Sequence, residues 1–185
     1  TWEVDQTAPT LTLQQALAQV DPTNTATITF TLSAGEALDP ATITASDFTV
    51  TNGSTPVVTG SGTTWTITTT ATADGNVAIA PSGTFSIADL AGNAVTTTGG
   101  TDRTVTYDAT APTVTLAQAA GQADPTNGSS ITFTLSSNEA LDGTTIAASD
   151  FTITNGSTPT VAGSGTSFTI STTATAPGAV TIAPS

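Results

Sequence analysis

The two halves of this chain carry the same residues at a constant offset, and this repeat limits what the chain can fold into. Residues 21–24 (Asp-Pro-Thr-Asn) recur as residues 124–127, so the offset is 124 − 21 = 103. Residues 51–56 (Thr-Asn-Gly-Ser-Thr-Pro) recur unchanged as residues 154–159. Solenoid repeats run to roughly 20–50 residues and cannot fold alone, whereas this period has the length of a small independent domain. The sequence therefore predicts consecutive domains joined like beads on a string.

The phase of the repeat predicts where the domains begin and end. Residues 1–7 align with the end of the first copy, so we interpret them as the closing strand and linker of a preceding repeat. Residues 8–108 form one repeat, and residues 109–185 form a second, incomplete repeat whose closing strand is missing. Two explanations remain open: the chain continues as a longer array, or a strand from another chain completes the fold by β-augmentation. We favour the longer array, because a short donor such as residues 1–5 would not replace the loop that is also missing.

Alternating apolar and polar residues predict β-strands throughout each repeat. In residues 27–32 the apolar side chains alternate with threonine, whose branched side chain suits a pleated, half-wet surface. Turn signals such as Asn52-Gly53 separate the strands. The strands expected in the first repeat lie at residues 10–13, 27–32, 48–51, 64–68, 76–79 and 103–107. This pattern predicts an all-β fold made of tandem Ig-like antiparallel sandwiches of about seven strands each.

The predicted core consists of the apolar residues that face inward from these strands. In the first repeat they are Leu13, Ile28, Phe30, Leu32, Phe48, Val50, Trp65, Ile67, Val77, Ile79, Val105 and Tyr107. In the second they are Leu116, Ile131, Phe133, Leu135, Phe151, Ile153, Phe168, Ile170, Val180 and Ile182. Trp65 corresponds to Phe168 on an alternating strand, so a core role is favoured over stacking on a ligand.

The charge balance excludes several classes of function. The chain has a formal net charge of −13, Arg103 as its single basic residue, and no His, Lys or Cys. A surface this acidic argues against binding to nucleic acid or to anionic membranes, and no apolar stretch is long enough for insertion into a bilayer. The usual general base, Schiff-base amine and thiol nucleophile are missing, so we predict that the domains are not enzymes.

Acidic residues are the candidate binding groups that remain. In a seven-stranded sandwich, strand direction brings the incoming linker, the loop after the second strand and the loop before the last strand to one pole. Carboxylates gathered there would repel one another unless a hard cation such as calcium, which takes about six to eight oxygen ligands, binds between them. The candidate metal ligands are Asp5, Glu36, Asp39 and Asp89 in one set, and Asp108, Glu139 and Asp142 in the other.

The alternative is that these acidic residues are ordinary turn and cap residues, a role in which Asp is common. We favour this alternative for Asp21 and Asp47. For the two junction sets both interpretations stay open, and calcium is the cofactor that the metal hypothesis implies.

Three motifs occur in a fixed order: the linker Asp-x-Thr-Ala-Pro-Thr (residues 5–10 and 108–113), the strand Ser-Asp-Phe-Thr (46–49) and the loop Asp-Leu-Ala-Gly-Asn (89–93). Together they resemble the bacterial Ig-like repeats of large surface adhesins and related fibrous cell-surface proteins, and the resemblance covers the whole chain. It implies an extracellular spacer or stalk, calcium at domain junctions in some branches of the family, and no catalysis.

The leading hypothesis is therefore a structural segment of an extracellular, cell-surface stalk or filament that holds an adhesive or other tip away from the cell. Its partners would be neighbouring repeats of the same chain or copies of itself in a filament. The alternatives are a carbohydrate- or protein-binding Ig-like module and an accessory domain of a larger secreted enzyme. An exposed aromatic pair would favour a binding module, but residues 81–100 offer only Phe85 and Leu90.

Overall fold

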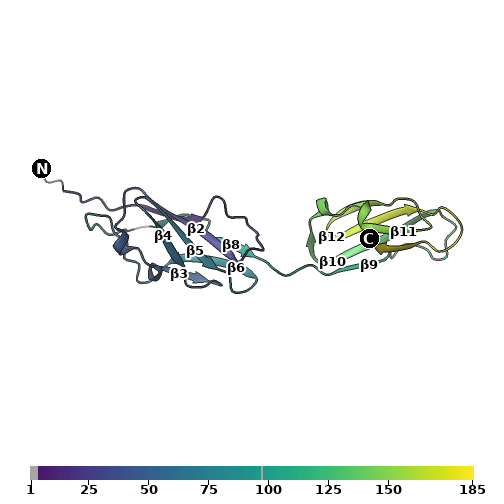
Figure 1. Cartoon of the computed structure of the whole chain (residues 1–185), viewed down its shortest axis with the longest axis horizontal. Coiled ribbons are helices and arrows are strands. Elements are labelled where there is room, and N and C mark those ends of the chain that lie inside the picture. Colours follow the sequence, from purple (N-terminus) through teal and green to yellow (C-terminus); the bar gives the residue numbers. More distant parts are fainter. Residues whose placement is uncertain (1–3, 97) are drawn as a thin grey trace. The chain divides into compact units, whose positions relative to one another are not determined.

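The computed structural model describes residues 4–96 and 98–185, and the chain divides into two compact units between Thr110 and Ala111 (Figure 1). Residues 1–3, which the repeat assigns to the closing strand of a preceding domain, lie outside the described residues. None of the helices in the described part of the chain is long or apolar enough to span a membrane.

The first unit contains a five-stranded sheet in the order β4-β5-β2-β1-β7. Its strands are β1 (Leu11–Gln15), β2 (Thr27–Ala34), β4 (Val57–Ser61), β5 (Thr64–Thr70) and β7 (Thr98–Gly99). Neighbouring strands are antiparallel except β1 and β7, which run parallel. The central strand β2 has the predicted alternation, because its apolar side chains are buried while the threonines between them are exposed or half-buried.

The second sheet of this unit has three antiparallel strands in the order β3-β6-β8. They are β3 (Phe48–Thr51), β6 (Gly75–Pro81) and β8 (Thr104–Tyr107). The two sheets divide the strands as an Ig-like sandwich does, with strands 1, 2, 4 and 5 in one sheet and 3, 6 and 8 in the other. The predicted all-β, Ig-like fold is confirmed.

The described part of the first unit has two strands that the sequence pattern did not predict, β4 and β7. Strand β4 is an edge strand whose residues are all at least partly exposed, so it lacks the apolar alternation that marks an inner strand. Strands β4 and β5 are joined by a tight turn, because Ser61 already pairs with Thr64 across a two-residue loop. Gly62 has φ +61° there, a left-handed conformation that costs glycine little.

Helical structure in the described residues is limited to four single 3₁₀ turns. They are η1 (Pro40–Thr42), η2 (Ala45–Asp47), η3 (Gly143–Thr145) and η4 (Ala148–Asp150). Each turn lies between two strands and has an acidic residue as its cap or at its last position. Acidic residues therefore fix the loops between the second and third strands of both units.

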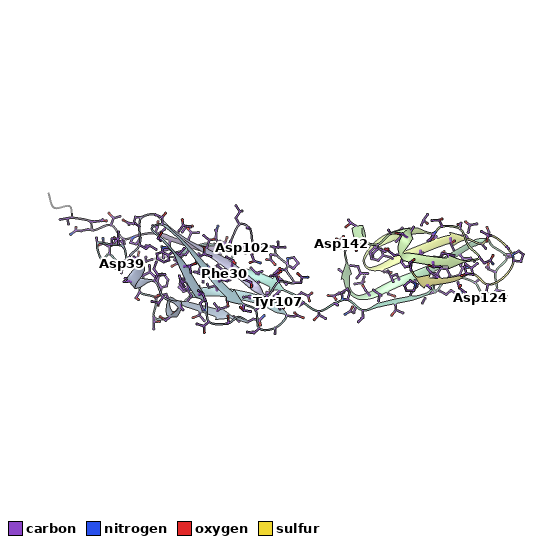
Figure 2. The ribbon with its side chains drawn as sticks, viewed as in Figure 1. Phe30, Asp39, Asp102, Tyr107, Asp124 and Asp142 are labelled. Atoms are coloured by element: carbon purple, nitrogen blue, oxygen red, sulfur yellow. The ribbon has the colours of Figure 1, made fainter. Side chains whose placement is uncertain are left out.

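The core of the first unit lies between its two sheets, with Phe30 near the centre (Figure 2). Ten of the twelve predicted core residues are buried, and Val50 and Tyr107 are half-buried against them. Trp65 is 4% exposed and its indole N–H donates to the carbonyl oxygen of Gly62, which confirms its core role. Four further core residues come from strand ends and loops: Leu11, Leu38, Ile43 and Ile87.

The second unit has a three-stranded sheet in the order β12-β10-β9 and a two-stranded sheet of β11 and β13. The strands are β9 (Val114–Gln118), β10 (Ser130–Leu141), β11 (Phe151–Thr154), β12 (Thr160–Thr173) and β13 (Thr181–Pro184). Within residues 111–185, β13 pairs only with β11, whereas its counterpart β6 pairs with strands on both sides. One edge of the smaller sheet therefore has no partner strand in this part of the chain.

The predicted core of the second unit is only partly correct. Phe133, Leu135, Phe168 and Ile170 are buried, and the other six predicted core residues are half-buried. Those six are Leu116, Ile131, Phe151, Ile153, Val180 and Ile182. Five of their six counterparts in the first unit are buried, all except Val50. There β7 pairs with β1, β8 pairs with β6, and the ring of Phe85 packs edge-on against Phe48, and residues 111–185 contain no equivalent of these segments.

Candidate cation site

Three carboxylates meet at one end of the first unit: Asp5, Glu36 and Asp89. Asp5 lies in the segment that leads into β1, Glu36 follows β2, and Asp89 lies in the segment after β6. One carboxylate oxygen from each residue lies within 4.8 Å of the other two. Calcium binds oxygen at about 2.3–2.6 Å, so two oxygens on one ion lie within about 5 Å of each other. The spacing of the three carboxylates therefore fits a single cation.

Asp89 is the most firmly placed of the three, because the turn that follows it surrounds its carboxylate with donors. Its Oδ1 accepts the backbone N–H groups of Ala91 and Asn93, each at 2.8 Å, and its Oδ2 accepts the Asn93 side-chain amide at 2.8 Å. The residue is 3% exposed. Burial raises the pKa of Asp89, but these bonds and one from the Gly92 N–H outweigh burial and hold the pKa below its ordinary value. Asp89 is therefore a fixed and charged candidate ligand.

Asn93 also connects the loop of Asp89 to the segment of Asp5. Its Nδ2 donates to the backbone carbonyl oxygen of Asp5 at 3.2 Å, and the Asp5 carboxylate accepts the Thr7 N–H at 2.9 Å. The sequence interpretation did not assign a role to Asn93. The signal for it was the order of residues in the loop 89–93, where Asn follows Asp by four positions.

Glu36 is the least stabilised of the three carboxylates. It is half-buried and follows Gly35, whose backbone N–H donates to Thr10 at 3.0 Å and so holds the start of β1 against the end of β2. Burial raises the pKa of Glu36, and the negative charges of Asp5 and then Asp89 raise it further. A bound cation would remove this penalty, because it favours the charged form of all three groups.

The single basic residue does not neutralise this group. The Arg103 guanidinium donates to the backbone carbonyl oxygens of Thr98 and Gly99, at 3.1 and 2.9 Å, and so holds β7 in place. An all-oxygen set of three carboxylates without a basic partner suits a hard cation. Backbone oxygens or water would have to complete the about six to eight ligands of calcium.

Asp39 and Asp142 lie outside this group and act as caps of 3₁₀ turns. The Asp39 Oδ1 accepts the Ala41 N–H at 2.9 Å, and the Asp142 Oδ1 accepts the Thr144 N–H at 2.9 Å. The Thr144 hydroxyl, followed by its N–H, holds the pKa of Asp142 below its ordinary value. Both carboxylates are therefore engaged in their own loops.

The second predicted set is divided between the two units, and its assembly into one site stays a prediction. Asp108 belongs to the first unit, where its carboxylate accepts the Thr110 N–H at 3.1 Å, while Glu139 and Asp142 belong to the second unit. Glu139 lies near the end of β10, and its backbone oxygen accepts the Ser137 hydroxyl.

The two residues interpreted as caps have structural roles. Asp47 is 2% exposed, and its carboxylate accepts the Thr44 N–H at 2.8 Å and the Ser86 N–H at 3.0 Å. Asp21 accepts the Thr106 N–H of β8 at 2.9 Å. These acids fasten a loop and a strand, so they join segments that are far apart in the sequence.

Asp74 has a structural role that the sequence interpretation missed. Its carboxylate accepts the Ala109 N–H at 2.8 Å and the Thr110 hydroxyl, just after the end of β8. The hydroxyl, followed by the N–H, holds the pKa of Asp74 below its ordinary value against a smaller effect of burial. The counterpart of Asp74 is Pro177, so the repeat itself gave no signal for this contact.

A family model described as a bacterial Ig-like domain matches residues 5–107. Among solved structures, the chain is similar to one titled as the adhesin InvE of Yersinia pseudotuberculosis, with 17% identity and a TM-score of 0.30. The match covers 90% of this chain and 51% of that one, so the chain spans about half the length of this structural relative. No curated protein matches the chain.

Proposed function

Because the chain belongs to the bacterial Ig-like domain family, we propose that it is a structural segment of an extracellular surface stalk. In this role it spaces an adhesive or other tip from the cell, and neighbouring repeats are its partners. The location outside the cell also fits a composition with one basic residue, because trypsin-like proteases would find a single cleavage site.

The observation that carries this proposal is the path of the chain through the first unit. The chain enters at the end where Leu11 pairs with Ala34, and it leaves at the opposite end, where Tyr107 pairs with Gly75. Both ends are fastened by side chains, through Asn93 to the Asp5 carbonyl and through Asp74 to residues 109–110. A unit with fastened ends on opposite sides can transmit tension along the chain.

Calcium binding by Asp5, Glu36 and Asp89 belongs to the same proposal. An ion at this site would tie the segment before β1 to the loop of Asp89 and so stiffen the point where the chain enters the unit. Extracellular calcium modules bind at roughly 0.1–1 mM, which suits a site built from three side chains.

Labelling of intact cells tests the location. Antibodies raised against residues 1–185 should bind unpermeabilised cells of the source organism, while antibodies against a cytoplasmic protein should bind only after permeabilisation. Labelling by both antibodies only after permeabilisation would contradict an extracellular stalk. Single-molecule pulling from both ends then tests the mechanical role, and the expected result is a discrete unfolding event for the first unit.

A further inference from the structure

The tetrapeptide Thr-Asn-Gly-Ser is present at three places in the chain, at residues 51–54, 126–129 and 154–157. An asparagine followed by glycine is open to attack by its own backbone, because glycine has no Cβ to keep its nitrogen away from the asparagine side chain. The three tetrapeptides are identical in sequence, so a difference in their reactivity has to come from the fold around them.

The fold restrains two of these asparagines, Asn52 and Asn155, which are half-buried and have φ of +56° and +60°. The Asn52 amide donates to the carbonyl oxygen of Ala73 at 2.7 Å, and its Oδ1 accepts the Thr72 hydroxyl at 3.1 Å. Equivalent bonds hold Asn155. A Cβ added to the glycine that follows would lie 2.6 Å from a neighbouring side chain in both places. Neither asparagine can therefore rearrange without local opening of the structure.

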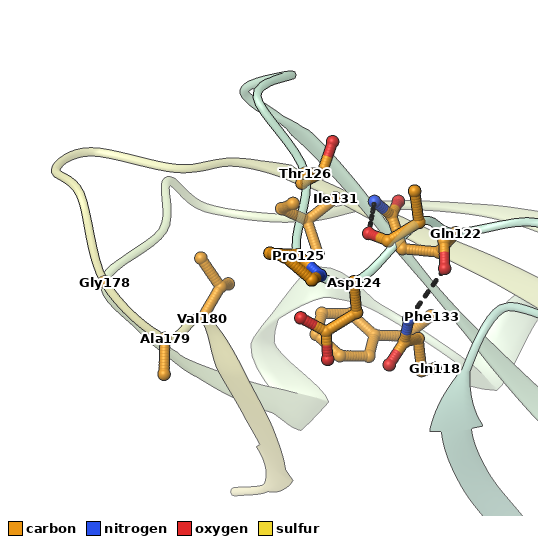
Figure 3. Close-up of a pocket in the computed structure, with 11 residues that line it drawn as sticks. Gln118, Gln122, Asp124, Pro125, Thr126, Ile131, Phe133, Gly178, Ala179 and Val180 are labelled. Carbon is orange, nitrogen blue, oxygen red and sulfur yellow. Dashed lines mark hydrogen bonds between the residues drawn. The ribbon is translucent and has the colours of Figure 1, made fainter.

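The third asparagine, Asn127, lies in an exposed loop of the second unit. It directly follows Asp124, Pro125 and Thr126, which line one side of a pocket (Figure 3). Asn127 and Gly128 are exposed, and a Cβ added to Gly128 would meet only the Thr126 hydroxyl, at 3.5 Å. The Gly128 N–H donates to the same hydroxyl at 3.1 Å, while none of the described residues bonds to the Asn127 side chain. That side chain can therefore turn toward the Gly128 nitrogen.

The corresponding loop of the first unit has the same local bond and the same exposure. Asn24, the counterpart of Asn127, is exposed, and the Thr25 N–H donates to the Thr23 hydroxyl at 3.1 Å. Exposure of the asparagine is therefore a property of this loop in both units. The first unit has Thr25 where the second has Gly128, and a β-branched side chain at this position hinders approach of the backbone nitrogen to the asparagine.

We propose that Asn127 is a site of spontaneous deamidation, with water as the co-reactant. The Gly128 backbone nitrogen attacks Cγ of Asn127 and gives its proton to solvent, and the side-chain nitrogen leaves as ammonia. Water then opens the resulting succinimide ring at either of its carbonyl groups, which yields aspartate or isoaspartate without any transfer of electrons. The product adds a negative charge to a loop that already contains Asp124, and isoaspartate also lengthens the backbone just before β10. The reaction needs no other protein, so it does not depend on where the chain resides.

Incubation of the purified 185-residue chain at mildly alkaline pH tests this assignment. Digestion with pepsin at low pH, which halts the reaction, followed by mass spectrometry, measures the conversion of each asparagine separately. Asn127 should be converted about tenfold faster than Asn52 and Asn155, because those two react only after local opening. In urea that unfolds both units the three rates should converge, since the tetrapeptides are identical.

Two substitutions at equivalent positions serve as matched controls, with the fluorescence of buried Trp65 as the check on folding of the first unit. Gly128→Thr places in the second loop the residue type of the first, and it should abolish the fast conversion of Asn127. Thr25→Gly is the reverse exchange, and it should make Asn24 reactive.

Three results would overturn the proposal. The first is conversion of the three Asn-Gly sites at equal rates in the folded protein. The second is an Asn127 that still reacts faster than the other two in urea, because neighbouring residues rather than the fold would then set the rate. The third is a folded Thr25→Gly variant in which Asn24 stays unreactive.

Discussion

The side-chain amide of Asn93 donates to the carboxylate of Asp89 at 2.8 Å, and this bond closes the loop 89–93 on itself. The same nitrogen also reaches the carbonyl oxygen of Asp5. Asn93 therefore keeps two acidic residues in place although it carries no charge. The stability of the first unit should depend on it.

Replacing Asn93 with Ala should lower the stability of the first unit. The change leaves the buried Asp89 carboxylate without one of its donors and frees the segment around Asp5. Denaturation in chelator, followed by the fluorescence of buried Trp65, measures the shift. Asn24→Ala is the control, since Asn24 is exposed in a turn. Equal midpoints for the two variants would contradict a structural role for Asn93.

Calcium should stabilise the first unit through Asp5, Glu36 and Asp89. At tenfold excess over the dissociation constant, one site adds about 1.4 kcal/mol to the free energy of unfolding. Thermal melts in calcium and in chelator measure this difference. Glu36→Gln should abolish it, while Asp39→Asn should retain it, because Asp39 caps its own 3₁₀ turn. Identical melts of the unmodified protein in both buffers would rule the site out.

Without calcium, the stability of the first unit should depend on pH through Glu36, whose charge is disfavoured by burial and by Asp5 and Asp89. Its pKa in the folded protein is raised above the ordinary value of 4.5, so the folded state holds this proton more tightly than the unfolded state. Glu36 therefore contributes to the free energy of unfolding at low pH, and this contribution is lost as the pH rises through the raised pKa. Glu36→Gln should therefore be more stable than the unmodified protein at neutral pH, and the difference should shrink toward about pH 4. A difference that grows on acidification would contradict this assignment.

Asp74 should control the mobility of residues 109–110 rather than the stability of the sandwich. In Asp74→Ala the amide of Ala109 loses its acceptor, so its hydrogen exchange should accelerate while the denaturation midpoint changes little. Asp102→Ala, on an exposed side chain, serves as control. In the unmodified protein the protection should persist to low pH and fade as the pH falls through the lowered pKa of Asp74.

A matched pair of core substitutions should show that equivalent core residues contribute less to stability in the second unit than in the first. Ile28 is 0% exposed, so Ile28→Ala should cost about 2–5 kcal/mol. Its counterpart Ile131 is half-buried, so Ile131→Ala should cost clearly less. Residue-resolved hydrogen exchange separates the two units. Equal costs would contradict the difference in burial between Ile28 and Ile131.

The inner strands could be predicted because the alternation of apolar and polar residues marks a strand with one buried face, as in β2 and β5. Strands β4 and β7 could not, since an exposed edge strand and a two-residue strand carry no such pattern. Leu38 and Ile87 join the core from loops, where neither a period of two nor any turn signal marks an inward side chain. The partial burial in the second unit was also missed, because a residue pattern shows which face is apolar but not what covers it.

Strand direction was enough to predict that Asp5, Glu36 and Asp89 share one end of the first unit. It could not exclude Asp39, which is three residues from Glu36. The 3₁₀ turn at Pro40 decides its role, because the exposed N–H of Ala41 takes the carboxylate as a cap. Asp74 and Asn93 act through backbone groups distant in sequence, and no local pattern reveals such contacts.

The anchoring of Arg103 has a consequence for proteolysis. Arg103 is the single cleavage site for trypsin in the chain, and it directly precedes β8. Its guanidinium is bound to β7 and its carbonyl oxygen accepts the Ile79 N–H, so a protease would have to detach this segment before cutting. One cut would yield two fragments, residues 1–103 and 104–185. The rate of that cut therefore measures how often the segment around Arg103 and the start of β8 detaches from the first unit.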